Sequence, residues 1–182
     1  MSEFAKNLLK EQDLVKKVEL ITNFQRKEDV FFDTTVIFKA EIAKMFIETM
    51  NISVDKNLVL TACLVYSFKK QNNPKEIDRV KEYKKEDLQY LKSLGFDERF
   101  CKICSEYNRY DEPKNYIREK EGDLIEIVDQ FVGMLTHRQD RLAYSVQEAV
   151  DLLENKNLKG CHNQYLEPFK EFVDVMEGFE VW

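Results

Sequence analysis

Apolar side chains recur along most of the chain at intervals of three, four or seven residues, which places them on one face of an α-helix. No segment sustains the alternation of apolar and polar residues that a half-buried strand shows. The pattern predicts helices over residues 3–24, 34–50, 53–70, 85–94, 97–108, 122–138, 145–153 and 165–176. We therefore expect an all-α fold, a bundle of about seven to nine helices in a single domain over residues 1–182.

Residues that favour helix ends stand at several of these boundaries. Gly95 is expected to end the helix that begins near residue 85, because glycine readily takes the left-handed conformation of a helix C-terminus. Pro74 fits the first turn of a helix that Asn73 would start, and Ser145 forms a capping box with Glu148. The side chains expected to cap helix N-termini are Ser53, Asn73, Asp97 and Ser145.

The composition fits a globular helical protein. Hydrophobic residues make up 43% of the chain and charged residues 34%, which excludes a disordered chain. No apolar run approaches the roughly 20 residues that span a bilayer. Residues 1–17 are too charged for a secretory signal, so we expect a cytoplasmic protein with no membrane partner.

The net charge argues against a nucleic-acid partner. A formal charge of −6 provides no overall attraction to phosphate backbones. Residues 69–85 are locally basic, with seven Lys or Arg residues, but a solvated helix face and loop explain this stretch more simply. We therefore expect no nucleic-acid binding.

Metal-ligating residue types are scarce. Cys101 and Cys104 form a C-x-x-C pair inside a predicted helix, and a zinc site would have to add Cys161 and His162. Those last two are adjacent in sequence and rarely converge on one tetrahedral ion, so buried free thiols are the simpler interpretation. We expect no cofactor and no bound metal.

One carboxylate stands out. Asp129 lies in an otherwise apolar helix segment, and Arg138 and Arg141 follow it. Two guanidinium groups near a partly buried carboxylate suit a phosphate ligand. A structural ion pair gives the same pattern, and the residues alone leave both alternatives open.

The segment around Asp129 resembles the C-terminal half of an HD-GYP domain. Residues 127–141 read IVDQFVGMLTHRQDR and residues 145–149 read SVQEA, where the family has V-A-D-x-x-D-A-L, R-P-Y-R and a capped helix with S-x-x-E-A. Residues 62–70, ACLVYSFKK, are similar to the helix that carries A-x-L-L-H-D-I-G-K, and residues 165–169 to the closing helix. The resemblance implies an HD-like bundle over residues 30–172, with an N-terminal helix over 1–29 and a tail over 173–182.

The motifs that give the family its name are degenerate. The family hydrolyses phosphodiesters with two or three metal ions, and its HD-GYP branch acts on cyclic di-GMP. Of the ligand positions only Asp129 is retained, so the resemblance implies a protein without metal-dependent catalysis. The degenerate positions are Thr34 or Thr35 for the first histidine, Tyr66 and Ser67 for His-Asp, and Cys104, Ser105 and Glu106 for H-H-E.

The resemblance also implies a remnant of the family's pocket. Lys70, Asp129, Arg138 and Arg141 fall at family positions, and we expect them to line it. The resemblance therefore implies a catalytically inactive module with a regulatory or binding role. Its expected partner is a phosphate-containing nucleotide, such as cyclic di-GMP, or another protein. Two alternatives stay open: a metal-dependent phosphohydrolase with a rearranged site, and a helical module that only binds proteins. If Tyr66 fills the pocket, the same residues become a buried ion-pair network without a ligand.

Overall fold

The computed structural model describes residues 2–28, 33–68, 80–107, 116–137 and 142–178. Within these ranges the chain forms nine α-helices and no β-strand, which confirms the predicted all-α class. A single turn of π-helix, Leu153–Asn157, follows α8. The helices are α1 (Glu3–Lys10), α2 (Leu14–Glu28), α3 (Thr35–Thr49), α4 (Lys56–Val65), α5 (Val80–Ser93), α6 (Glu98–Ser105), α7 (Lys120–Leu135), α8 (Val146–Leu152) and α9 (Leu166–Glu177).

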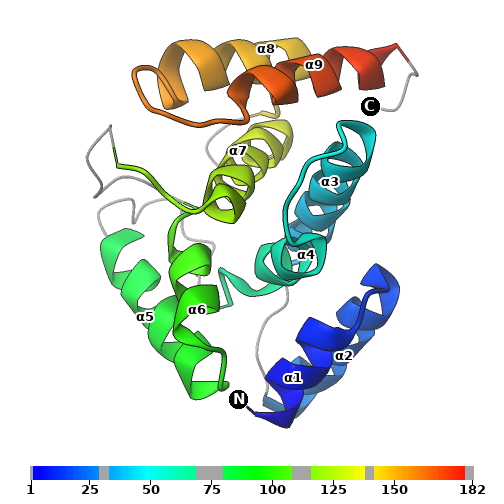
Figure 1. Cartoon of the computed structure of the whole chain (residues 1–182), viewed down its shortest axis with the longest axis vertical. Coiled ribbons are helices and arrows are strands. Elements are labelled where there is room, and N and C mark those ends of the chain that lie inside the picture. The colour runs from blue at the N-terminus through cyan, green and yellow to red at the C-terminus, as the bar shows by residue number, and fades with distance from the viewer. Residues whose placement is uncertain (1, 29–32, 69–79, 108–115, 138–141, 179–182) are drawn as a thin grey trace.

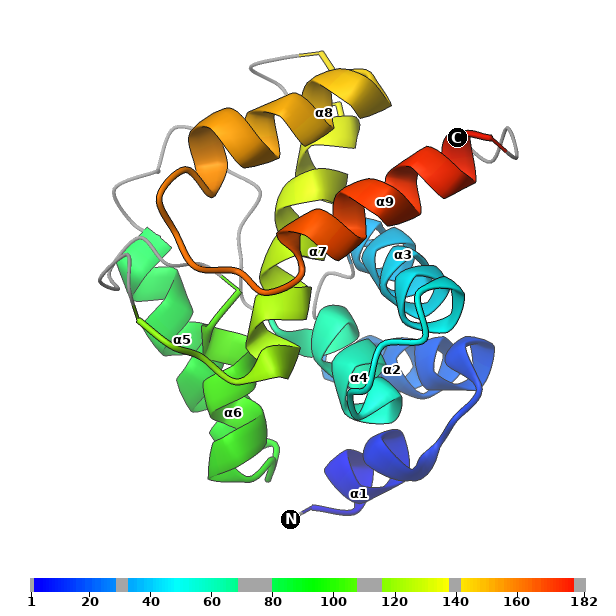
Figure 2. The same ribbon diagram turned by 45° about the horizontal axis from the view of Figure 1, so that its top comes forward.

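Helix α7 lies at the centre of the bundle (Figure 1) and packs against α3, α4, α6 and α8. Every residue of α7 from Glu121 to Val128 is buried. Helices α8 and α9 cross over one end of α7, as the turned view in Figure 2 shows. Helices α1 and α2 pack against α4 on the far side of the molecule.

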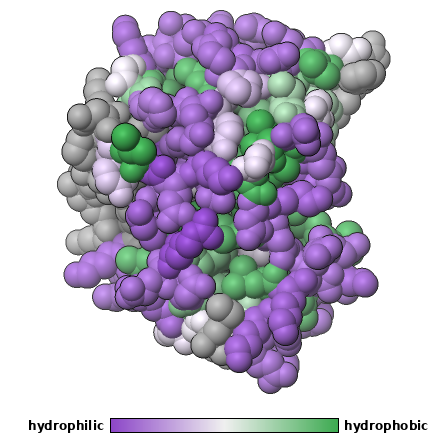
Figure 3. All heavy atoms as spheres, viewed as in Figure 1, coloured by the Kyte–Doolittle hydropathy of each residue, from purple (hydrophilic) through white to green (hydrophobic). Residues whose placement is uncertain are grey.

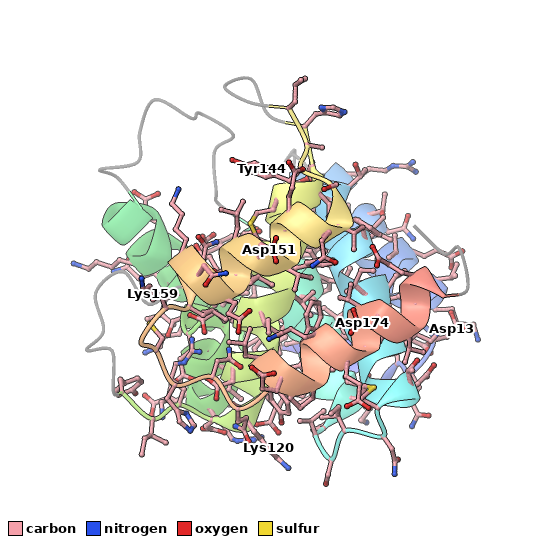
Figure 4. All side chains as sticks on the ribbon, turned by 90° about the horizontal axis from the view of Figure 1, so that it is seen from above. Asp13, Lys120, Tyr144, Asp151, Lys159 and Asp174 are labelled. Carbon is pink, nitrogen blue, oxygen red and sulfur yellow. The ribbon has the colours of Figure 1, made fainter. Side chains whose placement is uncertain are left out.

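Aromatic side chains join α9 to the core. The ring of Phe169 lies 5.0 Å from Phe46 of α3 and 5.0 Å from Phe131 of α7, between ring centroids and near the edge-to-face geometry that aromatic pairs prefer. The polar face of this layer points outward, as Asp151 of α8 and Asp174 of α9 show in Figure 4. Helix α9 therefore covers the core through one apolar face.

Helix α4 is apolar nearly all round, and all residues from Val59 to Val65 are buried. It packs against both α3 and α7. The prediction that the helix with Cys63 and the helix with Asp129 lie side by side in the core is therefore confirmed.

The prediction of one helix over residues 3–24, and of a single N-terminal helix over 1–29, is wrong. The chain breaks between α1 and α2, where Glu11 takes an extended conformation with φ −65° and ψ 131°. The Glu11 carboxylate accepts the backbone N–H groups of Gln12 and Asp13, at 2.9 and 3.0 Å, and Asp13 accepts the N–H of Lys16 at 3.0 Å. These bonds satisfy the amides that a continuous helix would have paired.

Polar groups from α2 and α4 hold the C-terminal end of α1. Lys17 is fully buried, and its Nζ donates to the carbonyl of Leu8 and to the hydroxyl of Thr61, both at 2.6 Å. Asn57 donates to the carbonyl of Leu9. Burial lowers the pKa of Lys17 to about 8, against the pull of more distant carboxylates. Local bonds of Glu11 and Asp13 and the more distant donors Lys17 and Asn57, which sequence periodicity does not reveal, together set where α1 stops.

Two further boundaries of the predicted helix over 53–70 differ from the structure. Asp55, rather than Ser53, caps α4 by accepting the N–H of Leu58 at 3.0 Å. The helix ends at Val65, so Tyr66 lies in the turn that follows. The predicted helix start at residues 73–74 lies outside the described residues.

The other predicted signals at helix ends are confirmed. Asp97 caps α6, and Ser145 and Glu148 form the capping box of α8. Gly95 follows α5 with a φ of +84°, which a residue with a side chain rarely adopts. A Cβ atom at Gly95 would also lie 2.4 Å from the backbone nitrogen of Ser2, so the turn after α5 needs glycine for both reasons.

Hydrophilic side chains cover most of the face shown in Figure 3, with apolar groups between them. Among the described helices, none combines the length and the apolar character needed to cross a bilayer.

Candidate functional site

Three side chains, two from helices and one from a turn, meet where the family resemblance places a metal centre. Lys39 comes from α3, Tyr66 follows α4 and Asp129 comes from α7. Lys39 Nζ lies 2.6 Å from Oδ1 of Asp129, and Lys39 also donates to the Tyr66 hydroxyl. The Tyr66 hydroxyl in turn donates to the same Oδ1 of Asp129. We call these three residues the ion-pair triad.

The triad is largely shielded from solvent. Tyr66 is 1% exposed, and the Lys39 and Asp129 side chains are 8% and 16% exposed. The ring of Tyr107 lies 4.5 Å from that of Tyr66, and Lys39 Nζ lies 5.2 Å from the Tyr66 ring centroid. Burial, followed by the nearby charge of Asp129, raises the pKa of Tyr66 well above its usual value. Tyr66 therefore stays protonated at neutral pH and acts as a hydrogen-bond donor to the carboxylate.

In the ion-pair triad the negative charge of the Asp129 carboxylate is neutralised by Lys39 and is not left available to a ligand. One oxygen of Asp129 accepts from both Lys39 and Tyr66, and a metal ion at that oxygen would have to displace both donors. A buried pair of opposite charges is stable when each group also finds hydrogen bonds, as Lys39 does here with two partners.

Lys39 is absent from the predicted site. The signal for it is a lysine in the largely apolar segment VIFKAEIA, four residues after Thr35, where a charge on a buried helix face needs a partner. Thr34 is exposed and Thr35 half-buried at the start of α3, one turn before Lys39. The position of the family's first histidine is therefore close to the triad along α3, but the lysine is the residue that contacts Asp129.

The predicted site residues that follow Thr35 in the sequence separate into three groups. Asp129 and Tyr66 lie in the triad, with Ser67 half-buried beside Tyr66. Cys104, Ser105 and Glu106 lie at the end of α6. The predicted pocket cations Lys70, Arg138 and Arg141 lie outside the described residues.

A crevice too narrow to hold a water molecule adjoins the triad on the side of α5 and α6. Burial raises the pKa of the Cys104 thiol well above its usual value and does the same for the Tyr107 hydroxyl. Neither group is therefore an ionised nucleophile at neutral pH. The crevice is lined by Tyr66, Asp87, Leu88, Leu91, Cys101, Cys104, Ser105 and Tyr107.

The cysteines do not assemble a metal site in the described part of the chain. Cys63, Cys101 and Cys104 are buried free thiols, and Cys161 is half-buried in the loop between α8 and α9. No group of three or more His, Cys, Asp or Glu side chains among the described residues could hold a metal ion.

A second buried network surrounds Arg118, just before α7. Its guanidinium Nη2 lies 2.6 Å from Oδ1 of Asp123 and also contacts Oε2 of Glu126, while Nη1 donates to the backbone carbonyl of Glu106. Asn163, from the loop before α9, donates to the carbonyl of Asp123 at 2.9 Å and to Oε2 of Glu126 at 3.0 Å. The Arg118 and Glu126 side chains are fully buried. We call this the Arg118 network.

The Arg118 network explains why α7 carries acidic residues on buried faces. It ties the end of α6, the start of α7 and the loop before α9 to one another. Glu106 packs directly on Gly122 of α7, where a Cβ atom would lie 2.4 Å from the Glu106 carboxylate and 3.0 Å from its Cβ. Burial raises the pKa of Glu106, so this carboxyl resists ionisation more than an exposed one. Among the described residues, Glu106 thus serves the contact between α6 and α7.

Comparisons with known proteins identify no relative of this chain. No family model matches the sequence, no curated protein matches it, and no solved structure matches the fold. The relationship to HD domains therefore stays a prediction from the motifs.

Proposed function

We propose that the chain is a catalytically inactive HD-like domain that acts as a regulatory or binding module. The observation that carries this proposal is the ion-pair triad, in which Lys39 Nζ lies 2.6 Å from Oδ1 of Asp129. In the family resemblance Asp129 corresponds to a metal ligand. An ammonium group of the protein itself now neutralises that carboxylate, so the charge that would attract a divalent ion is already balanced.

The chemistry of the surrounding groups supports the absence of hydrolysis. Phosphodiester cleavage needs an activated water or another strong nucleophile. Tyr66 and Cys104 both have raised pKa values, because each is buried and each has negative or ionisable neighbours. They remain protonated at neutral pH, and neither offers the imidazole that the family uses at these positions.

Metal analysis tests the inactive site directly. We expect protein dialysed against manganese, iron or zinc to retain less than about 0.1 ion per chain, because one neutralised carboxylate binds transition metals weakly. Elemental analysis of the dialysed protein measures this, with a Lys39→Met variant as the matched chain that lacks the competing ammonium. About one ion per wild-type chain would favour the rearranged phosphohydrolase instead, and zinc lost on Cys104→Ser would point to the cysteines.

A phosphate-containing nucleotide is the ligand class that the resemblance implies, and because Tyr66 is buried against Asp129 the ligand would bind to the predicted pocket cations rather than to Asp129. Lys39 supplies a full positive charge to Asp129, so that carboxylate does not by itself require a second cation. Lys70, Arg138 and Arg141, which the resemblance assigns to the pocket, would then contribute positive charge toward a phosphate group. This assignment rests on the motifs, because the three cations lie outside the described residues.

Calorimetry with cyclic di-GMP and with mononucleotides tests the ligand. We expect binding at roughly micromolar affinity, since three charge-assisted contacts near the upper end of about 1.5–3 kcal/mol each add up to the roughly 8 kcal/mol of that affinity. The double variant Arg138→Ala, Arg141→Ala should abolish binding, whereas Arg26→Ala with Lys16→Ala, which removes two exposed cations of α2, should leave it unchanged. If no heat of binding is measured at about 1 mM nucleotide, the nucleotide hypothesis is rejected. A protein then remains as the partner that this module would bind.

A further inference from the structure

We propose that this chain forms a domain-swapped dimer, in which α1 and α2 join into one continuous helix and each α1 docks on the other copy. The surface concerned is the one that α1 covers in the single chain, formed by α2, α4 and the turn after α5. The partner is a second copy of the same chain, since a second α1 is the segment that this surface already accepts.

The hinge between α1 and α2 is compatible with both conformations. It consists of Glu11, Gln12 and Asp13, and it contains neither glycine nor proline. Glutamate and glutamine are good helix formers, whereas Asp13 caps the first turn of α2 by accepting the N–H of Lys16 at 3.0 Å, so the three residues suit both the continuous and the broken form. Closing the hinge into a helix would replace three side-chain bonds to backbone amides by three ordinary helical bonds.

The contacts that hold α1 are separate from the hinge and can be made by either copy. Ala5 and Leu8 are fully buried, and the rings of Phe4 and Phe24 stack at 4.1 Å between centroids. At the other end of α1, Lys17 and Asn57 bind its last carbonyl groups. The α1 of a second copy would bury the same side chains, and its Leu8 and Leu9 carbonyls, which the continuous helix pairs with the amides of Gln12 and Asp13, would accept Lys17 and Asn57 as second donors.

An exposed apolar residue supplies an independent indication. Val15, in the first turn of α2, is 66% exposed. In a continuous helix it would follow Leu8 by seven residues and lie within about 20° of it around the helix axis. The broken form leaves Val15 in water, whereas the continuous helix extends the apolar face of α1 through Val15 toward the second copy.

Two substitutions at the hinge test the exchange in opposite directions. Gln12→Pro should hold the chain as a monomer, because proline at this position cannot continue the helix and Glu11 already has the extended conformation that a following proline requires. Gln12→Ala should raise the dimer fraction, because alanine favours the continuous helix. Size-exclusion chromatography with light scattering, at concentrations up to about 1 mM, measures both. A monomeric Gln12→Ala variant, or equal dimerisation of the two variants, would overturn the proposal.

A disulfide distinguishes exchange of α1 from ordinary association. In a Phe4→Cys, Phe24→Cys, Cys161→Ser variant, oxidation of the isolated dimer should link two chains covalently on a non-reducing gel, and oxidation of the monomer should not. Dimers that yield only internally linked single chains would contradict the exchange.

Val15→Ser should weaken the dimer roughly tenfold through lost apolar burial, with Lys16→Ser as the exposed neighbour that leaves it unchanged. Equal effects of these two substitutions on dimerisation would show that Val15 does not lie in the interface, and would contradict the continuous helix.

Discussion

Replacing Arg118 by methionine should lower the free energy of unfolding by about 3–5 kcal/mol, the usual effect of removing one partner from a buried ion pair. The guanidinium is fully buried, and it faces Asp123 and Glu126 as well as the carbonyl of Glu106. Without it, two carboxylates would stay buried with their negative charges uncompensated. Urea denaturation followed by circular dichroism measures the change.

Matched variants separate this effect from the loss of any arginine. Arg99 is 52% exposed in its side chain, and Arg99→Met should cost at most about 1 kcal/mol although Arg99 also pairs with glutamates. Adding Glu126→Gln to Arg118→Met should recover part of the loss, because one of the two uncompensated charges is removed. Arg118→Lys should fall between wild type and Arg118→Met, since an ammonium keeps the charge but loses the planar fork. Equal costs for Arg118→Met and Arg99→Met would contradict the role of the network.

Replacing Lys39 by methionine should lower the free energy of unfolding by about 2–4 kcal/mol, because Asp129 would remain largely buried without its ammonium partner. The effect should be smaller than at Arg118, since the Asp129 side chain is 16% exposed and water can solvate part of its charge. Lys44→Met, on the same helix but outside the triad, is the control and should change stability by less than about 1 kcal/mol. Denaturant unfolding of the two variants measures the difference.

A double-mutant cycle shows whether the two groups act on each other. Lys39→Met combined with Asp129→Asn should be less destabilised than the sum of the single variants, by about 1–3 kcal/mol of coupling. Tyr66→Phe should cost about 1 kcal/mol, the net value of one hydrogen bond. Additive effects of Lys39→Met and Asp129→Asn would mean that the ion pair contributes no coupling energy to stability. The ion pair would then no longer support the proposed function.

The sequence by itself determined the helical class and many of the helix ends. Asp97, Ser145 and Gly95 act at their boundaries through bonds and backbone angles that involve only the nearest residues. The apolar character of the helix around Cys63 correctly indicated a central position, because a helix without a polar face has to be buried. Local chemistry was sufficient for these features.

The tertiary structure alone decided the features that depend on partners distant along the chain. At the break between α1 and α2, Lys17 and Asn57 add to the local caps of Glu11 and Asp13, and Asn57 lies 48 residues from the carbonyl it binds. Likewise Lys39 and Asp129 are 90 residues apart, so neither periodicity nor a motif at one of them identifies the other. A buried charge indicates in the sequence that it needs a partner, and only the packing of α3 against α7 shows which residue supplies it.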